Sequence, residues 1–256
     1  MKPLTRLMIF PILLTFLAAC TLPGRGEGIS TGGSGATETV VSGNCANPLF
    51  PIVDHAVWDY KGVNPVTGEY LISYEIRQVG SEGFLLSIEF DTGVAGDQEW
   101  TCDGGDLTQL EAGYGPAGVV AALGGIYGSL DTDNVTGLTL PRSISAGDSW
   151  SQTMDLSGQV HLLKDTIGSA EGGYSASYTA IGMENVTVPA GTYNALRIQV
   201  DVLYDVVVTV EEINVPMPFP VSLTLWYAPG VGLVKAENLN EIIEHENIEL
   251  LRYFIP

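Results

Sequence analysis

Alternation of apolar and polar residues over 196–210 is the feature that most limits how this chain can fold. In the stretch LRIQVDVLYDVVVTV, every second residue from Leu196 to Val210 is apolar or aromatic, and most residues between them are polar or charged. A period of two predicts a β-strand with one face in a core and the other largely in water. At about 3.3 Å per residue the strand is roughly 50 Å long, which requires a strongly twisted or curled sheet.

The same alternation recurs at 72–77 and 84–90, and GSEG between these runs predicts a hairpin. Further strands are expected at 175–181, 221–227, 233–239 and 248–255. The apolar stretch VVAALGGIYG at 119–128 is interrupted by paired glycines, so it predicts a loop or a short irregular turn. The expected fold is therefore mainly β: one antiparallel curled sheet or open half-barrel with long strands, and little helix apart from the signal peptide.

The N-terminus has the layout of a secretory signal peptide. Lys2 and Arg6 precede an apolar run over 7–17, and small residues then lead to Cys20 in the stretch LAAC. About eleven apolar residues cover only half of a bilayer's hydrocarbon core. LAAC resembles the bacterial lipobox, in which the cysteine is diacylated and becomes the new N-terminus. The alternative is an ordinary signal peptide with an incidental Cys20.

Three cysteines leave an odd one in an exported protein. If Cys20 carries lipid, Cys45 and Cys102 remain as a pair in a compartment where disulfides persist. A link across 57 residues contributes about 4 kcal/mol in the loop-entropy model. Two buried free thiols are the alternative.

The sequence predicts three segments. Residues 1–19 are the lipoprotein signal peptide, 20–45 the lipidated cysteine and a flexible tether rich in Gly, Ser and Thr, and 46–256 a single β-rich domain. With 10 basic and 30 acidic residues, the chain is not expected to bind nucleic acid. An anionic membrane would also repel it, so attachment to the membrane depends on the lipid. The expected location is the cell membrane or outer membrane, with the domain facing the periplasm or the exterior.

Prolines occupy every second position in NVPMPFPV, at Pro216, Pro218 and Pro220. Because proline cannot donate to a sheet ladder, this stretch must bridge strands or lie at a sheet edge. We expect a broad hairpin with a stiff, extended tip. A proline-rich ligand for a partner's aromatic groove is the functional alternative.

Three motifs resemble those of a family of bacterial envelope lipoproteins. NPLFPIVDHAVWDY resembles the family's entry segment, and NVTVPAGTYNALRIQV and LWYAPGVGLVK resemble its later motifs. On these motifs the chain resembles the TapB-like lipoproteins, across 185–236 and to a lesser extent 46–90. The resemblance implies an antiparallel, curled β fold on a lipid anchor, with no established catalytic residues to carry over.

The later motifs also make sense as turns. Residues 189–191 predict a tight turn ahead of the long strand, and Pro229 with Gly230 predicts a hairpin between two strands. Trp226, Tyr227 and Tyr193 then either anchor these turns or form a ligand rim.

Candidate catalytic and metal-binding residues are few. The Gly-Asp-Ser block with Ser149 resembles the nucleophile block of SGNH esterases, with His161 or His245 as base, but its place among strand signals predicts a turn. No G-x-S-x-G elbow is present. We therefore expect no catalytic residue.

The sequence gives no stronger support for a metal site than for a catalytic residue. The three histidines are far apart and in no zinc-binding pattern. Asp131, Asp133 and Asn134 start like a calcium loop, but Thr136 and Arg142 stand where that loop needs glycine and glutamate. A solvated acidic turn is expected here, with a surface calcium site as the alternative, and no cofactor.

The expected function is that of a membrane-anchored, non-enzymatic binding or scaffold module of the envelope. One apolar face of a long sheet must be covered, either by the chain itself, by an apolar ligand or by a protein partner. A lipid or lipoprotein carrier is one alternative. A hydrolase of extracellular or envelope polymers, acting through paired carboxylates, is another.

Overall fold

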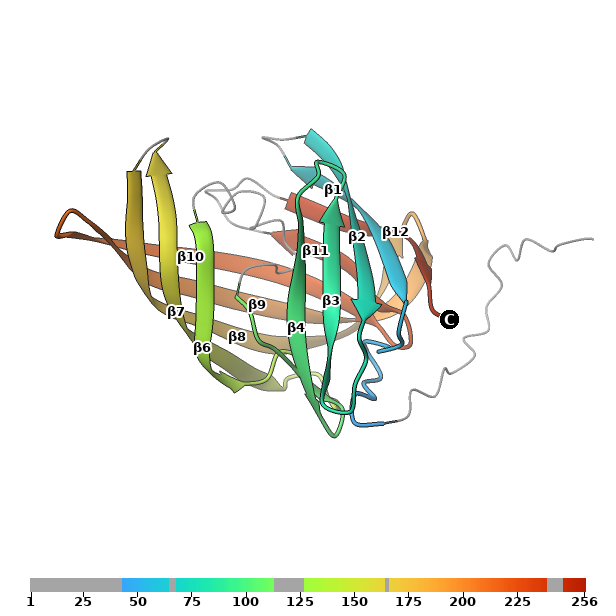
Figure 1. Ribbon diagram of the computed structural model, residues 1–256. Helices are drawn as coiled ribbons and strands as arrows, with labels where there is room; N and C mark the ends of the chain where they lie inside the picture. The colour runs from blue at the N-terminus through green and yellow to red at the C-terminus, as the bar shows by residue number, and fades with distance from the viewer. Residues whose placement is uncertain (1–42, 65–67, 113–126, 164–165, 239–245) are drawn as a thin grey trace, which may run out of the picture. The chain divides into compact units, whose positions relative to one another are not determined.

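The computed structural model describes residues 43–64, 68–112, 127–163, 166–238 and 246–256, all within one compact unit, Ala36–Pro256. These residues form an antiparallel sheet of twelve strands (Figure 1). The strands are β1 (Val57–Asn64), β2 (Gly68–Arg77), β3 (Gly83–Phe90), β4 (Ala95–Asp103), β5 (Asp106–Gln109), β6 (Tyr127–Gly137), β7 (Ser149–Leu163), β8 (Thr166–Val188), β9 (Gly191–Val210), β10 (Ile213–Ala228), β11 (Gly232–Asn238) and β12 (Glu246–Phe254).

The order of the strands makes the sheet a continuous meander joined at the chain's two ends. It runs β5-β4-β3-β2-β1-β12-β11-β10-β9-β8-β7-β6, so that β1 pairs with β12 and the edges are β5 and β6. The sheet curls until it is nearly closed into a barrel, with one unsealed seam between those edges. A single bridge, Leu107 to Leu140, crosses the seam among the described residues outside the named strands. The predicted fold class is confirmed.

The predicted long strand is present as β9, which extends five residues further toward the N-terminus than the alternation predicted. Ile198, Val200 and Val206 are buried, whereas Asp201 and Asp205 are exposed, so burial follows the alternation. The hairpin at 72–77 and 84–90 is likewise formed by β2 and β3, with Ile72 opposite Phe90. The strand expected at 175–181 is longer than predicted, because β8 pairs with β9 from Ser169 to Val188.

The proline stretch lies at a sheet edge, one of the two predicted placements. Residues 216–220 pair with β9 on one side, and β11 pairs with β10 only from Leu223 onward. Among the described residues, β9 is the strand that pairs with this half of β10, and such one-sided pairing suits residues that lack a backbone donor. The result is the expected long hairpin of β9 and β10, which turns at Glu211 and Glu212.

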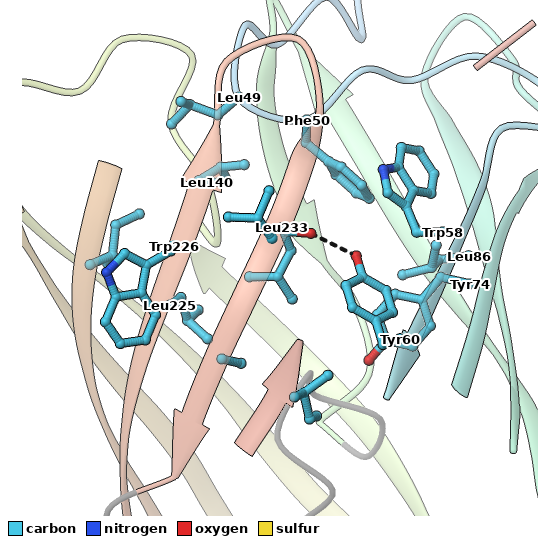
Figure 2. Packing of buried hydrophobic residues seen from close by; sticks show 14 of the residues in the cluster. Leu49, Phe50, Trp58, Tyr60, Tyr74, Leu86, Leu140, Leu225, Trp226 and Leu233 are labelled. Carbon is cyan, nitrogen blue, oxygen red and sulfur yellow. Dashed lines mark hydrogen bonds between the residues drawn. The ribbon is translucent and has the colours of Figure 1, made fainter. Parts of the chain in front are cut away.

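The core lies on the inner face of the curled sheet. Its larger cluster includes Trp58, Tyr60, Ile72 and Leu225, and Figure 2 shows Tyr60 and Tyr74 beside Leu233 in this cluster. A second, smaller cluster of buried hydrophobic residues includes Val206 and lies mainly on β7, β8 and β9.

A disulfide joins Cys45 to Cys102 on β4, with the Cα atoms 5.0 Å apart. The predicted pairing is therefore present, and the alternative of two free thiols is wrong. The link fixes the segment before β1 to the inner face of the sheet near the seam.

Some predictions fall outside the described residues. These are the signal peptide and Cys20, most of the tether, His245, and the apolar stretch 119–128 except Tyr127 and Gly128, which begin β6. Across the described ranges, no helix is long and apolar enough to cross a membrane.

Candidate functional site

A cavity of about 80 Å³ lies on the inner side of the curled sheet. Strands β1 to β5 and β8 to β11 all contribute inward-facing side chains to its wall. Since protein interiors are close-packed, voids much larger than a water molecule are few in a domain. One of this size holds roughly three water molecules, at about 30 Å³ each.

Aromatic side chains form much of the wall, and the strand pairing places them. Phe84 and Trp100 are cross-strand partners on β3 and β4, and their rings stack with centroids 5.7 Å apart. Tyr174 and Tyr204 are partners on β8 and β9, with centroids 5.2 Å apart. Cross-strand neighbours on one face are close enough for such rings to touch. Alternation along each strand therefore concentrates aromatic surface on the inner face.

The tyrosine hydroxyls around the cavity are held in their neutral form. Tyr60 donates to the carbonyl of Leu233 at 2.9 Å (dashed line in Figure 2), and Tyr204 donates to that of Ala112 at 2.7 Å. Burial raises the pKa of Tyr174 to about 12 and lifts the pKa of Tyr227 further above its ordinary value. Desolvation disfavours the charged form, so the cavity presents neutral hydroxyls at physiological pH.

Two further polar groups on the wall have no hydrogen-bond partner among the described residues. They are the side-chain amide nitrogen of Gln98 and the indole nitrogen of Trp100, both on β4. Gln98 is 2% exposed and Trp100 is 6% exposed. Buried donors are nearly always paired, so two on one wall need an explanation.

A chain of hydrogen bonds crosses the seam beside the cavity. The backbone N–H of Gln109 donates to Thr139 Oγ1 at 2.8 Å, Thr139 Oγ1 donates to Gln152 Oε1 at 2.9 Å, and Gln152 Nε2 donates to the Gln109 carbonyl at 2.7 Å. Gln152 is buried on β7, whereas Gln109 is on β5, so the chain links strands near both edges of the sheet. Side-chain hydrogen bonds thus connect the two edges of the sheet, where β5 and β6 do not pair with each other.

Asn47, which precedes β1 in the sequence, forms hydrogen bonds to both sides of the same seam. Its buried Nδ2 donates to the carbonyls of Gly105 at 2.9 Å and of Leu140 and Pro141 at 3.3 Å each. Its Oδ1 accepts from the backbone N–H of Leu49 at 2.9 Å. The sequence analysis missed this residue, although an asparagine between a cysteine and an apolar run is a signal for a local side-chain turn.

The predicted rim residues do not share one surface. Tyr227 lines the cavity, but Trp226, next to it on β10, points to the other face of the sheet. There its indole donates to Glu184 at 2.6 Å, under the charged groups of Arg197 and Lys235 at 5.8 and 5.2 Å from the ring centroid. Tyr193 instead donates to the carbonyl of Ala190 at 3.1 Å in the predicted turn.

The Gly-Asp-Ser block forms the predicted turn. The backbone N–H of Ser145 donates to Asp148 Oδ2 at 2.7 Å, and Ser149 begins β7. His161 is twelve residues along that same strand, roughly 40 Å away, so it cannot act as a base for Ser149.

The three residues that start like a calcium loop lie on a strand. Asp131, Asp133 and Asn134 belong to β6, and Asn134 Nδ2 donates to Asp155 Oδ2 at 2.7 Å. In the part of the chain that the structure describes, no three His, Cys, Asp or Glu side chains gather closely enough to hold a metal ion. The calcium site stays a prediction.

Fold and cavity together define an all-β protein whose curled sheet encloses a small, aromatic-walled space. Residues 131–244 match the model of a family described as DUF3108-like. This match spans most of β6 and all of β7 to β11, and it includes the segment 185–236.

Three solved structures, all of bacterial proteins, match this chain. An inferred exported protein with YmcC-like fold from Bacteroides fragilis is 16% identical, and an inferred lipoprotein from Parabacteroides distasonis is 15% identical; each aligns over 81% of this chain and 99% of its own, with a TM-score of 0.49. The hypothetical lipoprotein YmcC from Escherichia coli is 11% identical over 77% of this chain and 84% of its own, with a TM-score of 0.33. No curated protein matches the sequence.

Proposed function

We propose that this chain is a lipid-anchored, non-enzymatic binding module of the cell envelope, which takes a small apolar ligand into the cavity of its curled sheet. The observation that carries the proposal is the space of about 80 Å³ between aromatic walls. Ligand sites are typically concave, mostly apolar and lined by a few well-placed polar groups. The cavity has all three properties.

The volume of the cavity limits the size of the ligand. Space for roughly three water molecules takes one molecule of a few heavy atoms or the end of a longer one. A complete lipid needs several times that volume. We therefore favour a module that binds a small apolar compound over a carrier of whole lipids or lipoproteins.

The envelope location is proposed from the sequence, with support from the disulfide. The lipobox-like LAAC favours a signal peptide over 1–19, a lipid on Cys20 and a tether to residue 45, followed by one domain over 46–256. A disulfide between Cys45 and Cys102 fits a domain outside the cytoplasm, on the periplasmic or exterior side. The motifs shared with TapB-like lipoproteins favour the same assignment and lead us to propose membership of that group.

Native mass spectrometry of the mature lipid-anchored protein, released intact from phospholipid nanodiscs, tests the ligand cavity. We expect a small non-covalent adduct that is lost on denaturation and can be recovered by solvent extraction. Val202 lines the cavity and its neighbour Leu203 faces outward, so Val202→Phe should abolish the adduct and Leu203→Phe should keep it. The proposed function is contradicted if the protein with the wild-type sequence shows no adduct, or if the adduct is still present in the Val202→Phe variant.

A further inference from the structure

The unpartnered donors of the cavity lie on one strand and one face. Gln98 is opposite Leu86 and Trp100 is opposite Phe84 in the β3–β4 pairing, so both point inward two residues apart. Both line the cavity, and neither Gln98 Nε2 nor Trp100 Nε1 has an acceptor among the described residues. One ligand in the cavity therefore meets two N–H groups on the same wall.

The other three tryptophans show how this chain ordinarily treats a buried indole. Trp58 donates to the carbonyl of Val231 at 2.5 Å, Trp150 to that of Thr139 at 3.2 Å, and Trp226 to Glu184 at 2.6 Å. Each has an acceptor on a strand or loop packed against it. Trp100 differs because its side chain lines the cavity and its indole nitrogen has no acceptor among the described residues. Leaving a buried donor unpaired lowers the stability of a folded protein. A ligand whose acceptor bonds to that donor removes this cost, so the hydrogen bond contributes to the affinity.

The surroundings favour an uncharged acceptor over a carboxylate. Burial raises the pKa of Tyr178 and Tyr227, both on the cavity wall, because the site desolvates charge. The same desolvation penalises an anionic ligand, whereas a carbonyl or ether oxygen needs only the hydrogen bonds that Gln98 and Trp100 offer.

We infer that the cavity selects an uncharged, mainly apolar molecule with a carbonyl or ether oxygen, and that Gln98 and Trp100 bind this oxygen. The inference rests on the proposed function, since it identifies the class of ligand that the same cavity takes. Gln98 and Trp100 are the residues that determine specificity, and the aromatic wall supplies the apolar contact.

The test compares two probes of nearly equal shape on the mature, lipid-anchored protein in phospholipid nanodiscs, with ¹⁵N-labelled tryptophan indoles. Acetone carries the acceptor, and 2-methylpropene has a CH₂ group in place of the oxygen; both have four heavy atoms, which suits the size of the cavity. For each hydrogen bond gained, we expect acetone to bind about fivefold more tightly than 2-methylpropene, after correction for partition into the lipid. The Trp100 indole proton should move downfield with acetone alone, while the resonances of Trp58, Trp150 and Trp226 stay in place.

A matched pair of variants assigns the effect to Gln98. Gln98→Met keeps the length of the side chain without the donor, and it should weaken acetone binding about fivefold while leaving 2-methylpropene binding unchanged. Glu99→Met alters the outward-facing neighbour and should change neither. Unchanged resonances of the other three indoles show that each variant is folded.

The outcomes separate this inference from the proposed function. Equal binding of both probes without a shift of the Trp100 resonance overturns the carbonyl selectivity and leaves the apolar cavity standing. Failure of both probes to bind overturns both proposals.

Discussion

At the scale of single residues, the β9–β10 turn places two glutamates in a backbone conformation that glutamate disfavours. Val210 pairs with Ile213, so Glu211 and Glu212 form the whole loop, with φ angles of 48° and 72°. Two-residue hairpins of this kind suit Asn-Gly, because positive φ costs other residues about 1 kcal/mol or more each. Both glutamates are exposed, so they do not gain burial that would offset that cost.

Replacing Glu212 with glycine should stabilise the protein. We expect Glu212→Gly to raise the free energy of unfolding by about 1 kcal/mol and the Tm by roughly 2–4 °C, as measured by thermal denaturation. Glu212→Gln removes the charge but keeps the Cβ, and should have little effect. If Glu212→Gln stabilises as much as Glu212→Gly, repulsion between the carboxylates rather than backbone conformation is responsible.

At the scale of elements, hydrogen bonds outside the regular strand pairing hold the two edges of the seam together. Between β5 and the segment after β6, the backbone provides the bridge of Leu107 and Leu140 and a bond from the N–H of Thr139 to the Leu107 carbonyl at 3.0 Å. Side chains add further bonds. Asn47 supports three carbonyls there, in the β4–β5 turn and in the segment after β6. Arg142 adds bonds from its guanidinium to the Gly104 carbonyl at 2.9 Å and from its backbone N–H to Asp106 at 2.7 Å. These groups form a clasp between two elements that do not pair along their length.

Loss of Asn47 should open this clasp. We expect Asn47→Ala to lower the free energy of unfolding by about 3 kcal/mol, because several buried backbone groups lose their partner at once. Asn47→Asp should also destabilise, since a carboxylate facing three carbonyl oxygens cannot donate to them. Chemical denaturation measures both.

The control for the clasp is Asn194→Ala, at an exposed position of β9, which should change stability by no more than about 0.5 kcal/mol. Hydrogen exchange adds a local readout: the amides of Leu107 and Leu140, which cross the seam, should lose protection in Asn47→Ala. A variant as stable as the unmodified protein would show that the disulfide and Arg142 hold the seam without Asn47.

At the scale of the whole molecule, the alternation in the sequence predicted which strands form and which faces they bury. It did so for β2, β3 and β9 because a period of two is local information, carried by each strand alone. The cavity was not predictable in the same way. Gln98 and Trp100 stand two residues apart in QEW, but their lack of partners depends on β8 to β11, which the curl of the sheet brings opposite them. The rim of Trp226 and Tyr227, by contrast, could have been excluded from the sequence, since adjacent strand residues face opposite ways.

At the scale of the whole molecule, the proposed attachment of this domain to a membrane depends on a single residue, Cys20. Cys20→Ala should abolish labelling by an alkyne-tagged fatty acid and move the protein from the membrane to the soluble fraction of the envelope. The domain itself should not hold the membrane, because 30 acidic against 10 basic residues are repelled by anionic lipid. Cys102→Ser is the control: it removes the disulfide but should leave labelling and membrane attachment intact. Label that persists in Cys20→Ala would show that a different residue carries the lipid, whereas a wild-type protein without label would favour an ordinary, cleaved signal peptide.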